Sequence, residues 1–260
     1  MKLFAIIAAL IASAGPHPAP LVTAQAATAM DSTVAARPFG VGEKLTYDIK
    51  FGKLHVGTGY MQVLDTERVR DHEAYHTLFS IQGGIPLFRV DDRYESWFDT
   101  STLSSVRYTQ NIDEGQYQRK SHYEIFPRRS LYREGNADDP KPSVRNPLDD
   151  GSFLYFIRTV PLVVGETYTF SRYFRPDRNP VTIRVLRRER VTVPAGTFDA
   201  VVIQPIIKTT GIFSDKGQAE IWLSDDSRRI MLQMKSKLSI GSINLYLQSY
   251  QPPATSAAGS

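Results

Sequence analysis

The 260-residue sequence contains no cysteine. This absence excludes a disulfide framework, a thiolate metal site, a cysteine nucleophile and the lipidated cysteine of a lipoprotein. Enzyme fingerprints are missing as well: the chain has no G-x-S-x-G elbow, phosphate-cradling glycine loop or dinucleotide-binding motif. The sequence therefore reveals no reaction, and we expect a non-enzymatic protein without a cofactor.

Long apolar runs are also scarce. The run at residues 3–14 follows Lys2 and is shorter than the roughly 20 residues needed to span a bilayer. Gly15 and three prolines follow it, and residues 24–26 (AQA) form the small-x-small pattern that signal peptidase cuts. We therefore predict a cleavable signal peptide at 1–26 and a periplasmic mature protein without a transmembrane segment.

Positive charge is in small excess over negative charge. The chain has 31 basic and 27 acidic residues, and loss of Lys2 with the signal peptide removes one basic residue. Such a mild excess excludes nucleic acid as an expected partner. The arginines do cluster locally, at 128–129, 184–190 and 228–229. These clusters are interpreted either as the solvated faces of strands or as contacts for an anionic membrane surface.

Alternation of apolar and polar residues, with a period of two, is the dominant pattern in the sequence. Leu45, Tyr47, Ile49 and Phe51 alternate with polar residues, and similar runs recur along the chain between short turn sequences. Neighbouring strands joined by such short turns must pair antiparallel. We predict an all-β fold: a large curved antiparallel sheet, forming a barrel or half-barrel of about a dozen strands with one short helix. The single β domain is expected at 39–250, after a flexible lead-in at 27–38 and before a disordered tail at 251–260.

One segment departs from the alternation. In 149–160, apolar residues recur at helical spacing, and Asp149 or Asp150 can cap the first turn. This pattern predicts a short amphipathic helix whose apolar side covers the concave side of the sheet. The preceding loop, 135–148, is polar and proline-rich, and it is either a lid or an unstructured excursion.

Several phrases in fixed order resemble a known family. They are GEKLTY at 42–47, VDDRYES at 90–96, the helix with Arg158, VGE at 164–166, RERVTVPAGTF at 188–198 and AEIWLSDD at 219–226. Together they resemble the DUF3108 family of exported bacterial proteins over nearly all of the predicted mature chain. The resemblance implies a periplasmic β fold and no settled biochemical activity, and it assigns no functional residue.

The stretch His72-Glu73-Ala74-Tyr75-His76 matches H-E-x-x-H, in which two histidines bind zinc and the glutamate activates water. Glu95 follows at a spacing that resembles the third ligand of gluzincin-type peptidases. This chemistry requires a helix, whereas these histidines lead directly into a strand-like alternation. Residues four apart in a strand are separated by about 13 Å. We therefore predict no metal site, and a hairpin end with solvated histidines.

Four residues are the candidate ligand contacts: Asp92, Tyr94, Arg158 and Trp222. Asp92 and Tyr94 share one face of a strand and form either a polar cluster at a cavity mouth or part of an intrastrand ladder. Arg158 either holds an anionic ligand group or pairs with a carboxylate or a loop carbonyl. Trp222 either lines a lipophilic pocket or packs against its neighbours.

Three functions remain open. In the first, the concave side of the sheet binds or carries a lipid-like or other hydrophobic small molecule. In the second, the protein is an assembly or structural factor that presents a sheet edge or arginine-rich face to another envelope protein. The third is a zinc hydrolase that uses His72, His76 and Glu95, with Glu73 as its base.

Overall fold

The computed structural model of the protein describes residues 37–86, 88–208, 219–237 and 242–254. The predicted signal peptide, most of the predicted lead-in and residues 255–260 of the predicted tail lie outside them. The strands are β1 (Lys44–Phe51), β2 (Leu54–Val69), β3 (His72–Ile85), β4 (Phe88–Asp99), β5 (Ser105–Glu114), β6 (Tyr117–Phe126), β7 (Leu131–Glu134), β8 (Lys141–Pro142), β9 (Thr167–Phe170), β10 (Val181–Val193), β11 (Gly196–Ile206), β12 (Glu220–Ser224), β13 (Met231–Lys237) and β14 (Ser242–Gln251). The helical segments are η2 (Pro127–Arg129), α1 (Asp150–Phe156), η3 (Ile157–Thr159) and η4 (Pro176–Arg178).

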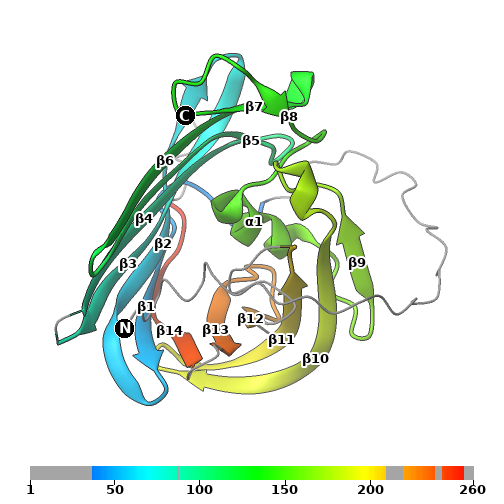
Figure 1. Cartoon of the computed structure of the whole chain (residues 1–260). Helices are drawn as coiled ribbons and strands as arrows, with labels where there is room; N and C mark the ends of the chain where they lie inside the picture. The colour runs from blue at the N-terminus through cyan, green and yellow to red at the C-terminus, as the bar shows by residue number, and fades with distance from the viewer. Residues whose placement is uncertain (1–36, 87, 209–218, 238–241, 255–260) are drawn as a thin grey trace, which may run out of the picture.

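All strands belong to one antiparallel sheet of 14 strands, which confirms the predicted fold class. Neighbours in sequence pair with each other, and β1 pairs with β14, so the two ends of the described chain meet in the middle of the sheet. The two edges are β8 and β9, which do not pair with each other. Within the described residues the sheet is therefore an open half-barrel, curved around α1 (Figure 1).

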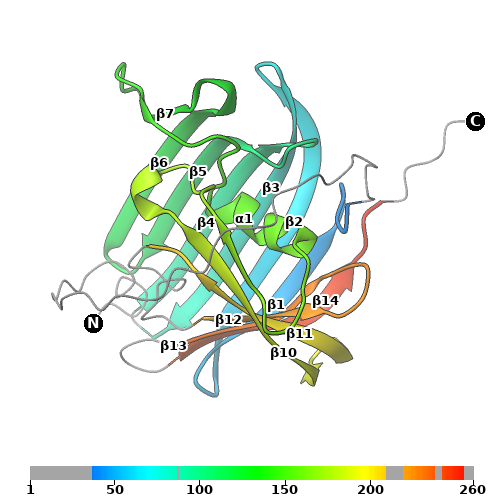
Figure 2. The same ribbon diagram turned by 90° about the vertical axis from the view of Figure 1, so that its right-hand side faces the viewer.

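The alternation in β1 explains which side of the sheet forms the core. Leu45, Tyr47 and Ile49 are buried, while Lys44 and the other polar residues between them remain partly exposed. Successive side chains of a strand point to opposite faces, so the apolar set lies on the concave side and the polar set on the convex side. Figure 2 shows β3–β6 and β10–β14 running in different directions on the two sides of α1.

The predicted helix is present as α1, with Asp149 as its N-cap. The Asp149 carboxylate accepts hydrogen bonds from the backbone N–H groups of Gly151 and Ser152, and Ser152 Oγ accepts from the Asp149 N–H. This reciprocal capping box satisfies donors that a helix end otherwise leaves unpaired. A Cβ atom at Gly151 would lie 2.8 Å from Ser96 Cβ, so a glycine here allows the helix to approach β4 closely.

The loop at 135–148 and the start of the predicted tail are attached to the fold. Lys141 pairs with Tyr132 through β8, and Leu148 forms an isolated bridge with Tyr173. At the other end, the Ala254 N–H donates to the Val41 carbonyl. None of the helices among the described residues is long and apolar enough to cross a membrane.

Candidate functional site

The structure does not bring the four predicted ligand contacts together. Arg158 lies in the interior, where its guanidinium contacts both carboxylate oxygens of Glu43 at 2.6 and 3.0 Å. It also donates to the carbonyls of Pro38 and Arg228. Burial raises the pKa of Glu43, while Arg158 lowers it. Arg158 thus joins the helix to two distant segments, which matches the interpretation that it pairs with a carboxylate and loop carbonyls.

Trp222 lies on the convex face, away from α1. Cross-strand pairing through β13 and β14 places Trp222 on the same face of the sheet as Asp48 of β1. Asp48 is on the convex face, because its neighbour Ile49 faces the core. The Arg187 guanidinium lies 5.7 Å and the Lys235 ammonium 5.2 Å from the centre of its ring system. These two cations cover the indole, so it packs against neighbours and does not face the concave side.

The H-E-x-x-H stretch is the first part of strand β3, so the helical geometry of a zinc peptidase is not formed. Each histidine instead contacts its own carboxylate across the strands: His72 contacts Asp99 and His76 contacts Glu95, each at 2.8 Å. The expectation of solvated histidines is wrong, because their side chains are only 11% and 16% exposed. His76 stacks on Trp97 at 4.3 Å, and this stacking excludes water from the ring.

Asp92 and Tyr94 do lie together, on the concave face of β4. Their face continues into Ser96 and Phe98, and Phe98 contacts Tyr155 of α1 at 5.4 Å between ring centres. The helix covers this end of the strand, where Ser96 and Phe98 are buried. Further along the same face Asp92 and Val90 are also buried, while Tyr94 and Phe88 are partly exposed.

Several half-buried apolar side chains of β3 and β4 lie together on this concave face. We call this group the concave wall, and it consists of Phe79, Ile81, Ile85, Phe88 and Tyr94. Cross-strand pairing places Phe79 opposite Tyr94 and Ile85 opposite Phe88. All five pack against the core from β3 and β4 without being fully enclosed. Partly exposed apolar surface on a concave face is the usual lining of a small-molecule site.

Two carboxyl groups lie beside this wall. The side chains of Asp92 and Glu114 are hydrogen-bonded to each other, and Asp92 also accepts from the Asp113 N–H at 3.1 Å. Burial and the neighbouring Asp92 carboxylate raise the pKa of Glu114 to about 8. Burial likewise raises the pKa of Asp92. Among the described residues no arginine or lysine pairs with either group, so the two share a proton at neutral pH.

A second polar group connects β5 and the segment around Tyr173 to α1. The Asp150 carboxylate accepts from the hydroxyls of Tyr108 at 3.0 Å and Tyr173 at 2.9 Å. Arg178 in turn donates to the Tyr173 hydroxyl at 3.3 Å. Burial raises the pKa of both tyrosines well above the ordinary value, so their hydroxyls remain protonated donors. This network fixes the N-terminal end of the helix and its loop over the sheet.

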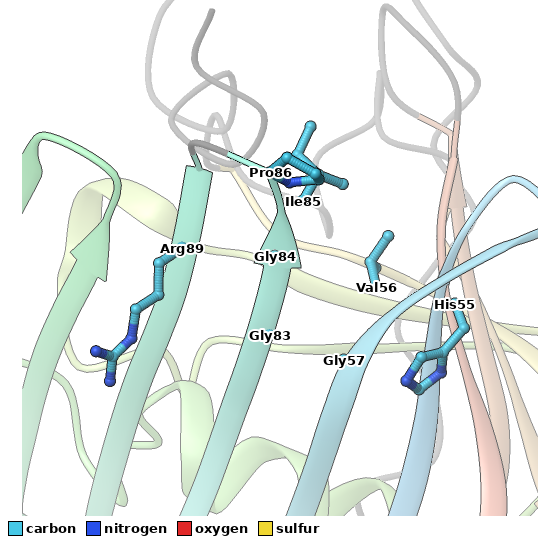
Figure 3. Close-up of a pocket in the computed structure, with 8 residues that line it drawn as sticks. All are labelled: His55, Val56, Gly57, Gly83, Gly84, Ile85, Pro86 and Arg89. Atoms are coloured by element: carbon cyan, nitrogen blue, oxygen red, sulfur yellow. The ribbon is translucent and has the colours of Figure 1, made fainter.

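A shallow, open cavity of about 380 Å³ lies at the tips of β2, β3 and β4. Ile85 is shared with the concave wall, whereas Arg89 and His55 at the flanks are on the convex side, beside Asp91 and Asp48. Figure 3 shows Gly57 on β2 beside Gly83 and Gly84 on β3, with His55 and Arg89 at the flanks. A Cβ at Gly83 would lie 2.1 Å from the Val56 carbonyl oxygen and 2.5 Å from Gly57 Cα. Only glycine permits this approach of two backbones, and the absence of side chains leaves the floor of the cavity open.

Sequence reasoning identified Asp92 and Tyr94 but missed Glu114 and the glycine cavity. Glu114 comes from a different strand, and it approaches Asp92 because Val90, two residues before Asp92, pairs with Glu114. The Gly83-Gly84 pair was visible as a local signal, since adjacent glycines within a strand often mark a bend or close backbone approach.

The family model described as Protein of unknown function (DUF3108) matches residues 46–248, which confirms the resemblance seen in the sequence. No curated protein matches the chain. A solved structure described as a beta-barrel-like protein of the DUF1849 domain, from Brucella abortus, superposes with a TM-score of 0.54 at 10% identity. The match covers 83% of this chain and 99% of that chain, and at this identity it shows the fold alone.

Two further solved structures are more distant. A proposed lipoprotein from Parabacteroides distasonis has a TM-score of 0.37 and 11% identity, covering 82% of this chain and 98% of that chain. A proposed exported protein with a YmcC-like fold, from Bacteroides fragilis, has a TM-score of 0.29 and 11% identity, covering 82% and 97%.

Proposed function

This chain belongs to the DUF3108 family of proteins of unknown function, and we propose that it is an exported, non-catalytic protein that binds a lipophilic small molecule on its concave side. Export is supported by the signal-like pattern at 1–26, which directs the mature protein to the periplasm. The binding role is carried by one observation, the half-buried apolar side chains of the concave wall.

The wall gives the ligand an apolar surface. Ile81 and Ile85 lie on the same face of β3, and the aromatic rings of Phe79 and Tyr94 lie 6.1 Å apart on adjacent strands. Burying such side chains against a ligand releases about 25 cal/mol per Å² of apolar surface removed from water.

The polar groups at the wall select the part of the ligand that faces them. Asp92 and Glu114 share one proton in the hydrogen bond between them, so at neutral pH the pair keeps one negative charge and offers its remaining oxygens as acceptors. A neutral hydroxyl or amide of the ligand can donate to these oxygens, whereas an anionic group would meet repulsion. We therefore propose a ligand with an apolar body and a neutral polar end at Asp92 and Tyr94.

The alternative of an assembly factor acting through a sheet edge receives less support from the geometry. The edge strands are short, at 2 residues for β8 and 4 residues for β9, and Pro142 in β8 cannot donate a backbone hydrogen bond. Short edges interrupted by proline are typical of strands protected against pairing with another chain.

The test is native mass spectrometry of the mature protein from its own periplasm, followed by organic extraction. We expect a lipophilic molecule at one per chain. I81W should fill the wall and lower occupancy about tenfold, because a bulky ring occupies the ligand's place. Q82W is the matched control, since Gln82 is the next residue and faces the convex side. A bare protein mass, or equal occupancy in both variants, would contradict binding at the wall.

A further inference from the structure

Several arginines gather on the convex face around Phe126, at the end of β6. The guanidinium carbons of Arg70, Arg133 and Arg129 lie 4.7, 5.4 and 5.8 Å from the centre of its ring. Arg128 precedes Arg129 in the short helical turn η2 and is also exposed. We call these four arginines and Phe126 the arginine cluster.

The face of the cluster follows from the strand register. Tyr123 and Ile125 are buried toward the core, so Phe126 and Glu124 point to the convex side. Arg133 lies opposite Glu124 on β7 and shares this face. The cluster is therefore on the other side of the sheet from the concave wall.

Positive charge exceeds negative charge here. Arg70 and Arg107 both bind Glu124, and Arg128 pairs with Asp71. Two carboxylates thus face the four arginines of the cluster and Arg107.

The remaining two guanidinium groups, of Arg129 and Arg133, have no carboxylate partner among the described residues. Contact with Phe126 holds both of them while leaving their N–H donors unused.

From this arrangement we propose that the arginine cluster is a docking surface for the phosphate groups of an anionic membrane. Guanidinium groups bind phosphate through paired N–H donors. The guanidinium groups of Arg129 and Arg133 are held against Phe126, and among the described residues their N–H donors are unused. The groups are spread over an open convex surface, which fits a plane of many headgroups better than one small ion.

The experiment is co-sedimentation of the mature protein with vesicles of phosphatidylglycerol and phosphatidylcholine in equal parts, or of phosphatidylcholine alone. We expect binding only to the anionic vesicles, weakening as salt increases. R129Q/R133Q should bind about thirtyfold more weakly, since each basic side chain near an anionic surface contributes a factor of roughly five.

R184Q/R190Q is the matched control, because it removes two exposed arginines from β10, outside the cluster. It should bind as the unmodified protein does, and R129K/R133K should retain most binding because the charge is kept. Circular dichroism must show that all variants are folded.

Three outcomes would overturn the proposal: no binding to anionic vesicles, equal binding to neutral vesicles, or an equal loss in the control variant. Binding to soluble polyglutamate but not to vesicles would assign the cluster to an acidic protein instead. The proposal is independent of the concave ligand, so I81W should leave vesicle binding unchanged.

Discussion

Glu43 and the Asp92–Glu114 pair are both buried carboxyl sites, but within the described part of the chain only Glu43 lies against a cation. Arg158 contacts both oxygens of Glu43 and bonds two backbone carbonyls besides, so the charge is neutralised within the core. Among the described residues, Asp92 and Glu114 have only each other, a backbone N–H and a long contact from Tyr94 at 3.5 Å.

The difference separates a self-contained ion pair from a carboxyl pair that lacks a cation among the described residues. A buried charge is tolerated when a partner and hydrogen bonds satisfy it, as they do for Glu43. A carboxyl pair without a cation costs stability whenever both groups ionise. The Asp92–Glu114 pair lies beside the half-buried concave wall, where the proposed function places the polar end of the ligand.

The largest effect is expected from breaking the Glu43–Arg158 pair. R158M leaves the Glu43 carboxylate buried without a partner and should lower the free energy of unfolding by about 3–5 kcal/mol. Urea denaturation measures this change. The exposed Arg190–Asp199 pair provides the control, and R190M should unfold at the same urea concentration as the unmodified protein.

If R158M does not fold, E43L/R158M still tests the assignment. Replacing both charged partners removes the uncompensated carboxylate, so this variant should fold and recover much of the lost stability. An R158M protein as stable as R190M would show that the pair does not hold the core together.

The second-largest effect is expected from the Asp92–Glu114 pair, whose contribution to stability depends on pH. The pKa of Glu114 is about 8 in the folded protein, against 4.5 as its ordinary value. The folded state therefore binds more protons between these values, and this group's contribution to stability falls as pH rises through that window. E114Q removes the titration and should raise the free energy of unfolding at pH 9 by roughly 2 kcal/mol, with little change at pH 4.

Thermal unfolding from pH 4 to 9 tests this prediction. E189Q is a useful comparison, because Arg187 lowers the pKa of Glu189 and the substitution should give no gain at pH 9. A parallel pH dependence in E114Q and the unmodified protein would show that Glu114 ionises normally.

The smallest effect concerns a third buried carboxyl, the helix cap Asp149, which is satisfied by hydrogen-bond donors alone. It accepts from Ser96 Oγ at 2.7 Å and from two backbone N–H groups of α1, while burial raises its pKa to about 7. D149N preserves an acceptor and should lower the unfolding free energy by less than about 0.5 kcal/mol, whereas D149A should cost about 1–2 kcal/mol. Equal losses in urea denaturation would mean that the charge, and not the cap, matters.

Local features of the sequence determined much of the fold. Alternation over 45–51 follows from the two-residue repeat of a strand, and short turns force antiparallel pairing. The break in this alternation, with Asp149 before it, located α1 and its cap. These signals depend on neighbours in the chain, so they can be read without knowing the rest of the molecule.

Only the tertiary structure decided which side each functional residue faces and what it meets. Arg158 pairs with a carboxylate 115 residues away, and Trp222 lies on the convex face because of the register across β12–β14 and β1. Whether the sheet closes also depends on the relation between β8 and β9, which lie at opposite edges. Such contacts are set by pairing and curvature accumulated over many strands, and no short sequence pattern contains them.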